Sequence, residues 1–178
     1  MKVLSVKQPW SFLICSGIKD IENRSWKLPE KYKGERVLIH ASRSTTKNGL
    51  HNYSMFTKSQ LDAIKQAKCE RDLRQLYLNV YSCPKYLYIA NSVSSYSAII
   101  GSVEIVDCVL NHPSIWAEPS NEVYKDPKIY GDNKIDSAVW NWVLAKPILF
   151  DKPILNVKGK LGFWDYDLPE EYEKLLKL

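Results

Sequence analysis

Short apolar runs, rich in β-branched residues and separated by polar or turn-forming stretches, dominate the chain and predict β-strands. The clearest run is 98–110, AIIGSVEIVDCVL, where Gly101 marks a bulge or the close approach of another backbone. Toward the C-terminus, 138–144 is predicted as a strand and 148–157 as strand pieces broken at Pro153. Other strand signals cover 3–6, 36–42 and 163–166, and 20–26 is predicted to be extended.

Helical signals are fewer, and the first follows directly on the opening strand. Pro9 is well tolerated in a first helical turn, and Trp10, Leu13 and Ile14 stand at the spacing of one buried helical face. Gly17 is suited to the left-handed conformation just past a helix end. We therefore expect a short helix that ends just before Gly17.

A second helix is predicted from a capping box, in which Thr57 caps the first turn together with Gln60. Helical spacing continues through Ile64 and on toward Tyr77, as one long or two short helices, and a last short helix is expected over 169–176. Strands outnumber helices, so the pattern predicts an α+β domain with a strongly bent sheet. The stretches predicted as loops are 44–54, 92–97 and 111–136.

Length and composition bound the class of protein. The chain has 178 residues, which suits one domain spanning 1–178. Its net charge of +5 permits contact with phosphate backbones but is too small to indicate nucleic acid by itself. The four cysteines and three histidines show no ligand spacing, so no metal or other cofactor is predicted. No apolar run has the length of a signal peptide or a membrane span, which predicts a cytoplasmic protein with no membrane partner.

Three charged residues, Lys19, Glu22 and Arg24, follow the first predicted helix within the segment GIKDIENR. On an extended chain Glu22 and Arg24 share a face, and Lys19 lies close enough for the opposite charges to hold one another in place. Arg24 is suited to donate to phosphate or to a base edge, Glu22 to accept from an exocyclic amino group, and Lys19 to donate or, if burial lowers its pKa, to act as a base. On spacing alone, a surface ion pair along a solvated strand is the favoured interpretation.

The order of motifs along the chain resembles the ASCH domain family of the PUA-like superfamily. These motifs are LSVKQPW, GIKDIENR, RVLIHAS, IIGSVEIVDC, WNWVL and KGKLGFW, and the most specific, 17–24, is similar to the family's G-x-K-x-x-E-x-R signature. The resemblance spans nearly the whole chain, with insertions near 44–97 and 111–136. It implies a PUA-like bent β-barrel with flanking helices, a cleft lined by Lys19 and Glu22, and binding to or action on RNA or nucleotides. It also reverses the preference for a mere surface ion pair.

Four further side chains are candidates for ligand binding in the same cleft. Gln8 and Trp10 stand at the entry to the first helix, although Trp10 also has the spacing of a core residue. His40 and Ser42 share a face of the strand over 36–42, where a lone histidine is more often structural than catalytic. Basic residues near turns that suit phosphate contacts, and that are more often simply solvated, are Arg43, Lys158 and Lys160.

Three function classes remain open. The preferred one is a module that binds RNA or a modified nucleoside, with an unstacked base against an aromatic ring and its edge at Glu22 and Arg24. The second is a metal-independent hydrolase, either a ribonuclease or an amidohydrolase of N-acylated pyrimidine nucleosides, with Lys19 and Glu22 as catalytic residues. In the amidohydrolase branch of the family a Thr nucleophile follows the Lys by three positions, and here that position holds Glu22. The third is a protein-interaction module of a transcription-related complex.

Overall fold

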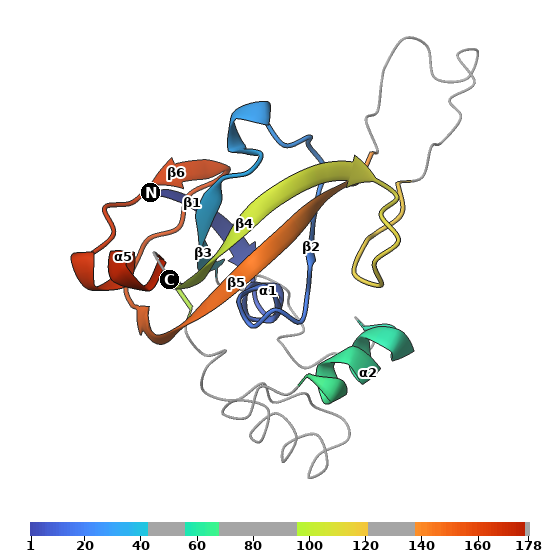
Figure 1. The fold of residues 1–178 in the computed structure, drawn as a ribbon, viewed down its shortest axis with the longest axis horizontal. Helices are drawn as coiled ribbons and strands as arrows, with labels where there is room; N and C mark the ends of the chain where they lie inside the picture. Colours follow the sequence, from blue (N-terminus) through green and yellow to red (C-terminus); the bar gives the residue numbers. More distant parts are fainter. Residues whose placement is uncertain (43–55, 68–95, 121–137, 177–178) are drawn as a thin grey trace.

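The computed structural model describes residues 1–42, 56–67, 96–120 and 138–176 (Figure 1). Some expectations from the sequence lie outside these described residues. They are the loop over 44–54, the continuation of the second helix toward Tyr77, most of the stretch 92–97, the distal part of 111–136, and Arg43.

A six-stranded sheet in the order β2-β5-β4-β3-β1-β6 forms the body of the described chain. β1 and β3 run parallel, and the other pairs of neighbours are antiparallel. β4 and β5 are long, strongly curved and lie side by side (Figure 1). The predicted α+β class with a strongly bent sheet is therefore confirmed. The strands are β1 (Lys2–Lys7), β2 (Ile21–Arg24), β3 (Arg36–Ser42), β4 (Ala98–Leu110), β5 (Trp140–Ile154) and β6 (Phe163–Asp165).

Gly101 has both of the properties predicted for it. The pairing of β4 with β5 shifts register between Ile99 and Gly101, so the strand bulges there. A Cβ atom at this position would lie 2.1 Å from the main-chain oxygen of Ile148 and 2.9 Å from Cys15 Sγ. The missing side chain thus lets β4 bend closely over the first helix.

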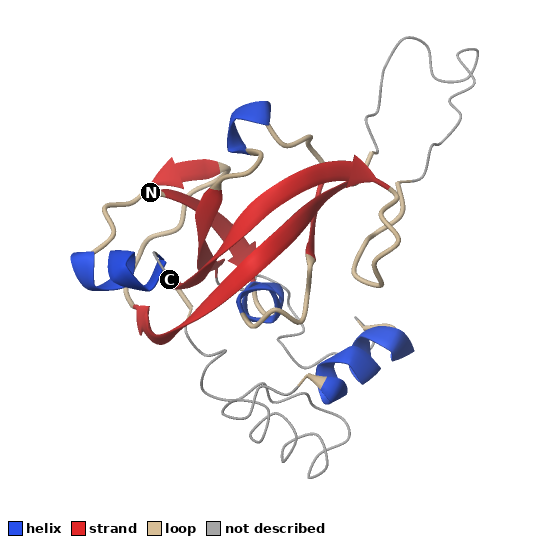
Figure 2. Cartoon of the chain, in the orientation of Figure 1, coloured by secondary structure: helices blue, strands red, loops and turns tan. Residues whose placement is uncertain are grey.

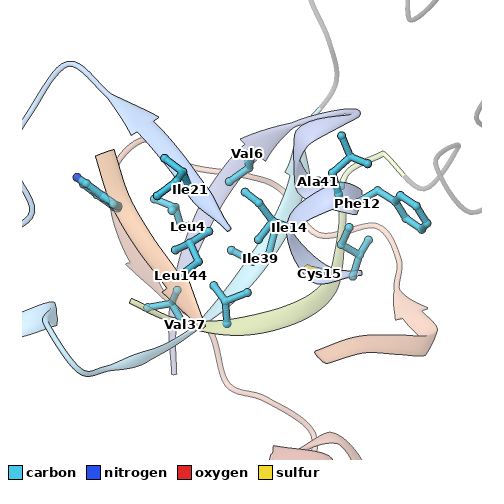
Figure 3. Packing of buried hydrophobic residues seen from close by; sticks show 14 of the residues in the cluster. Leu4, Val6, Phe12, Ile14, Cys15, Ile21, Val37, Ile39, Ala41 and Leu144 are labelled. Carbon is cyan, nitrogen blue, oxygen red and sulfur yellow. The ribbon is translucent and has the colours of Figure 1, made fainter. Parts of the chain in front are cut away.

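The first helix, α1 (Trp10–Cys15), packs against the sheet and ends as the sequence predicts. Figure 3 shows its Ile14 beside Ile39 of β3, and both side chains are buried in one hydrophobic cluster. Gly17 has a φ of +77°, and the backbone N–H of Lys19 donates to Leu13 O at 2.9 Å, which closes the helix end. Lys19 therefore leaves the helix in a fixed direction.

The described residues contain three other helical elements. α2 (Lys58–Gln66) begins with the predicted capping box, because Gln60 N donates to Thr57 Oγ1 at 3.2 Å and Thr57 N donates to Gln60 Oε1 at 3.0 Å. A 3₁₀ turn at Glu30–Tyr32 was not predicted, and α5 (Glu170–Leu176) ends the described chain. Figure 2 shows the strands as a curved layer with α1 against it and α2 farther away.

The prediction of strand pieces broken at Pro153 was wrong, because β5 continues through this residue to Ile154. β5 pairs with β2 only from Trp140 to Val143. Beyond Val143 the edge of β5 that faces away from β4 has no neighbouring strand, so a proline there removes no hydrogen bond on that side. The ladder with β4 is irregular between the pairs Gly101 to Leu149 and Ile99 to Ile154. Pro153 lies in that irregular stretch, where a missing N–H is tolerated.

The two edges of the sheet, β2 and β6, are brought together by an aromatic cluster. Phe163 of β6 stacks on Trp142 of β5 at 5.6 Å between ring centroids, with an angle of 6° between the rings. Trp26, which follows β2, meets Trp142 edge-on at 4.6 Å, and Tyr32 lies 4.0 Å from Phe163. The sheet therefore curls so that aromatic side chains bridge its two ends, and the candidate site lies beside this seam.

Candidate functional site

Two cations hold the carboxylate of Glu22. Glu22 Oε1 lies 3.0 Å from Arg24 Nε, and Glu22 Oε2 lies 3.7 Å from Lys19 Nζ. The Arg24 Nε–H is not aimed at this oxygen, so the contact is an ion pair rather than a linear hydrogen bond. The Glu22 side chain is only 10% exposed, which reduces screening by water. The three charges are thus fixed in one place.

Lys19 is a buried side chain whose charge is disfavoured by burial and favoured by nearby carboxylates. Its Nζ donates to Ile21 O and its side chain is 5% exposed. Burial lowers the pKa of Lys19, while the negative charges of Glu22, Glu118 and Asp20 act in the opposite direction. The surrounding carboxylates therefore offset only part of the cost of removing the ammonium from water.

Arg24 links two strands that are far apart in the sheet order. Its Nη2 donates to the main-chain oxygen of Ser5 on β1 at 2.9 Å, and its guanidinium lies 5.9 Å from the ring centroid of Trp142. β2 holds the residue in place through the pairing of Arg24 with Trp140 on β5. The guanidinium is therefore oriented by main chain, carboxylate and aromatic ring together.

A cleft with a volume of about 570 Å³ opens beside this cluster. Its walls come from β1, the start of α1, β2, β3 and the turn after β5. Predicted ligand residues Trp10, Glu22, Arg24, His40 and Ser42 all line it. The complete lining is Ser5, Val6, Lys7, Trp10, Glu22, Arg24, His40, Ser42, Ser97, Gly159, Lys160 and Leu161.

Cations dominate the rim of the cleft. Lys7 and Lys160 are exposed, and within the described chain neither forms an ion pair. Lys160 Nζ lies 5.6 Å from the ring centroid of Trp164, which leaves the ammonium open to solvent. With Arg24 inside and Glu22 as the carboxylate of the lining, the cleft carries a net positive charge that favours an anionic group at its mouth.

His40 forms the floor of the cleft, and one hydrogen bond fixes its ring. Its Nε2 donates to Val157 O at 2.9 Å, because a carbonyl oxygen can only accept, and its Nδ1 has no hydrogen-bond partner among the described residues. Burial lowers the pKa of His40, and the Val157 bond opposes this effect. A Cβ atom at Gly159 would lie 2.5 Å from His40 Cε1 and 2.8 Å from Nδ1. The turn can therefore lie on the imidazole only because residue 159 is a glycine.

A second cavity, called here the recess, has a volume of about 380 Å³ and lies on the other side of Trp10 and Glu22. Trp10 and Glu22 line both cavities, whereas Lys19 lines the recess and Arg24 lines the cleft. The complete lining of the recess is Trp10, Lys19, Glu22, Asn23, Thr57, Gln60, Ile115, Trp116, Ala117, Glu118 and Pro119.

Two asparagines hold the loop that walls the recess. Asn141 is fully buried, and its Nδ2 donates to Asn23 Oδ1 at 2.9 Å and to Glu118 O at 3.1 Å. Asn141 Oδ1 accepts from His112 N at 2.9 Å, and Asn23 Nδ2 donates to Trp116 O at 2.9 Å. Because each of these polar groups is paired, the loop is anchored to β2 and β5.

Gln8 is the predicted ligand residue that lines neither cavity. It is 3% exposed, it precedes α1, and its Oε1 accepts from Phe12 N of that helix at 3.3 Å. Ser5, Gly159 and Trp116 were not predicted from the sequence as site residues, and they reach the two cavities from β1, from the turn after β5 and from the anchored loop. Gly159 was visible as a turn residue, but the position of this turn over His40 depends on contacts between residues far apart in sequence, from His40 Nε2 to Val157 O and from Ser5 Oγ to Lys160 O.

Within the described ranges, no group of three or more His, Cys, Asp or Glu side chains is placed to hold a metal ion. The helices of the same ranges include none long and apolar enough to span a membrane.

A family model described as the ASCH domain matches residues 4–154. The chain belongs to the ASCH domain family. Its curved six-stranded sheet with flanking helices agrees with the α+β class expected from the sequence. No curated protein matches the chain.

Solved structures similar to this ASCH protein include ASCH from Zymomonas mobilis. That structure is 14% identical, with 99% of this chain and 94% of that chain covered and a TM-score of 0.46. Two mutant forms of the Zymomonas mobilis protein are each 15% identical, with a TM-score of 0.44 and 99% of this chain covered. The coverage of those two chains is 96% and 94%.

Proposed function

We propose that this ASCH protein binds RNA or a modified nucleoside, and that the cleft takes one unstacked nucleotide. The observation that carries the proposal is the position of Glu22, which is held by Lys19 and Arg24 and lines the cleft beside Trp10. A carboxylate fixed in this way accepts hydrogen bonds from an exocyclic amino group, and an indole offers apolar surface to a base. The family's association with RNA and nucleotides supports the same ligand class.

The size and charge of the cleft support this ligand. Its volume of about 570 Å³ lies within the range of about 300–1,000 Å³ that is common for small-molecule sites. Lys7 and Lys160 at the rim are suited to bind a phosphate. The hydroxyl of Ser42 on the wall is suited to hydrogen-bond with a ribose hydroxyl or with a base. The roles follow from position: Glu22 and Arg24 read the base edge, and the lysines orient the backbone.

The test compares two carboxylates that have the same kind of partners. Glu22 lies between Arg24 and Lys19, and Glu104 lies between Arg36 and Lys146 at 3.1 and 3.0 Å on the sheet away from the cleft. We expect Glu22→Gln to weaken the binding of AMP and short RNA about tenfold or more by isothermal titration calorimetry at low salt. Glu104→Gln should leave the affinity unchanged. Equal affinities for all three proteins, or no binding by the wild type, would contradict the proposal.

A hydrolase that uses the same residues is the second candidate, and one observation favours it. Burial lowers the pKa of Lys19, which increases the fraction of neutral amine available as a general base. The incubation of the protein with N4-acetylcytidine or short RNA tests this function. Turnover that is lost in both Lys19→Ala and Glu22→Ala would assign it to this site, whereas turnover that survives both substitutions would exclude the site as its source.

Several expectations from the sequence stay predictions beside this proposal. They are the single domain over 1–178, the cytoplasmic location, the absence of a cofactor, and the alternative role as a protein-interaction module.

A further inference from the structure

We propose that the recess is a second base subsite, which binds the base of the nucleotide next to the one in the cleft and prefers a base with an exocyclic amino group. The inference rests on the proposed function and extends it. It makes the ligand a strand of at least two nucleotides rather than a free nucleoside.

The two cavities share their dividing wall. Trp10 and Glu22 line both, and the carboxylate of Glu22 faces Arg24 with one oxygen and Lys19 with the other. A group bound in the recess is therefore next to a group bound in the cleft. Adjacent cavities of about 570 and 380 Å³ suit two neighbouring units of one ligand.

The walls of the recess are aromatic and held in place. Trp10 and Trp116 meet edge-on with ring centroids 6.4 Å apart, and Trp116 is 4% exposed. The main-chain oxygen of Trp116 accepts from Asn23, and Gln60 Nε2 donates to Ile115 O at 2.7 Å, so both ends of this wall are anchored. A preorganised apolar surface of this kind favours a planar base and loses little entropy on binding.

The polar groups of the recess favour a ligand that carries a hydrogen-bond donor. Lys19 is engaged by Ile21 O and Glu22, whereas the exposed carboxylate of Glu118 forms no hydrogen bond or ion pair with any described residue. The open group is therefore an acceptor, and Glu22 adds a second negative charge. A phosphate is disfavoured here and is attracted to the lysines at the rim of the cleft, while an amino group finds a partner in Glu118.

The experiment measures the affinities of AMP, ApA and UpU by isothermal titration calorimetry. We expect the wild type to bind ApA about tenfold or more tightly than AMP, because stacking of one more base contributes at least this factor to the affinity. The affinity for UpU should be lower than that for ApA, because uracil has no exocyclic amino group. Ala117→Trp, which fills the recess, should bring the ratio of ApA to AMP affinity close to one. Glu118→Gln, at an exposed position, should reduce the preference for ApA over UpU.

Val106→Trp is the matched control, because it adds the same side chain at a partly exposed position of β4 that lines neither cavity. It should keep the wild-type ratio of affinities, and thermal unfolding should show that all variants are folded. A wild type that binds AMP and ApA equally, or an unchanged ratio in Ala117→Trp, overturns the second subsite and leaves the cleft standing. No binding of either probe by the wild type overturns both proposals.

Discussion

The guanidinium of Arg24 on β2 donates to the main-chain oxygen of Ser5 on β1 at 2.9 Å. β1 and β2 are not neighbours in the sheet order, so this bond spans the seam where the edges of the sheet meet. The same guanidinium contacts Glu22, and all three residues line the cleft. Arg24 therefore contributes both to the contact across the seam, beside the aromatic cluster, and to the wall of the cleft.

Arg24→Met should destabilise the protein by about 1–3 kcal/mol, because a charge-assisted bond to a main-chain carbonyl and an ion pair with Glu22 are both lost. Arg24→Lys should recover only part of this loss. The ammonium keeps the positive charge, but it lacks the planar set of N–H donors of the guanidinium. Urea unfolding measures both variants. A change below about 0.5 kcal/mol for Arg24→Met would show that the seam does not need this residue.

Local signals in the sequence predicted much of the fold. The end of α1 at Gly17, the capping box of Thr57 and Gln60, and the bounds of β3 and β4 depend on neighbours within a few residues, so they were recoverable from spacing. The continuity of β5 through Pro153 was not recoverable. It depends on which strands flank that residue, and this is a property of the folded sheet.

Lys19 makes the stability of the protein depend on pH in a specific direction. Its pKa is lowered in the folded state, so above this pKa the unfolded chain, with an ordinary value of 10.5, binds more protons than the folded protein. Stability therefore rises with pH between the lowered pKa and 10.5, with a limiting slope of about 1.4 kcal/mol per pH unit. Below the lowered pKa the penalty is fully present.

The comparison of the wild type with Lys19→Met isolates this contribution. We expect the free energy of unfolding of the wild type to rise relative to the variant as the pH approaches 10.5, measured by urea unfolding over a pH series. A difference that stays constant would show that Lys19 has the same pKa in the folded and unfolded protein, and a difference that moves against the wild type would show that folding raises this pKa; either result contradicts the prediction.

Gly159→Ala tests the contact between the turn and the floor of the cleft. The added Cβ would lie within 3 Å of the His40 ring, and the φ of Gly159 is not left-handed, so its cost is steric. We expect a loss of about 1–3 kcal/mol in unfolding free energy and weaker nucleotide binding. In a His40→Ala background the same substitution should cost less than half as much. Equal costs in both backgrounds would place the turn away from the imidazole.

The candidate site was only partly predictable for the same reason as the fold. Lys19, Glu22 and Arg24 lie within one short segment, so their proximity follows from the chain itself. Ser5 and Gly159 reach the cleft through the parallel pairing of β1 with β3 and through the turn after β5, and these contacts join residues far apart in sequence. Gln8 looked available at the helix entry, yet its side chain is used to hold α1.

The most direct test of nucleotide binding in the cleft is an NMR titration of ¹⁵N-labelled protein with AMP, observed at the arginine Nε–H and tryptophan Nε1–H signals. Arg24 and Trp10 line the cleft, whereas Arg36 forms the comparable ion pair with Glu104 outside it. We predict saturable shifts of the Arg24 and Trp10 signals with no change at Arg36. Shifts confined to Arg36, or no saturable shift at Arg24 and Trp10, would contradict the account.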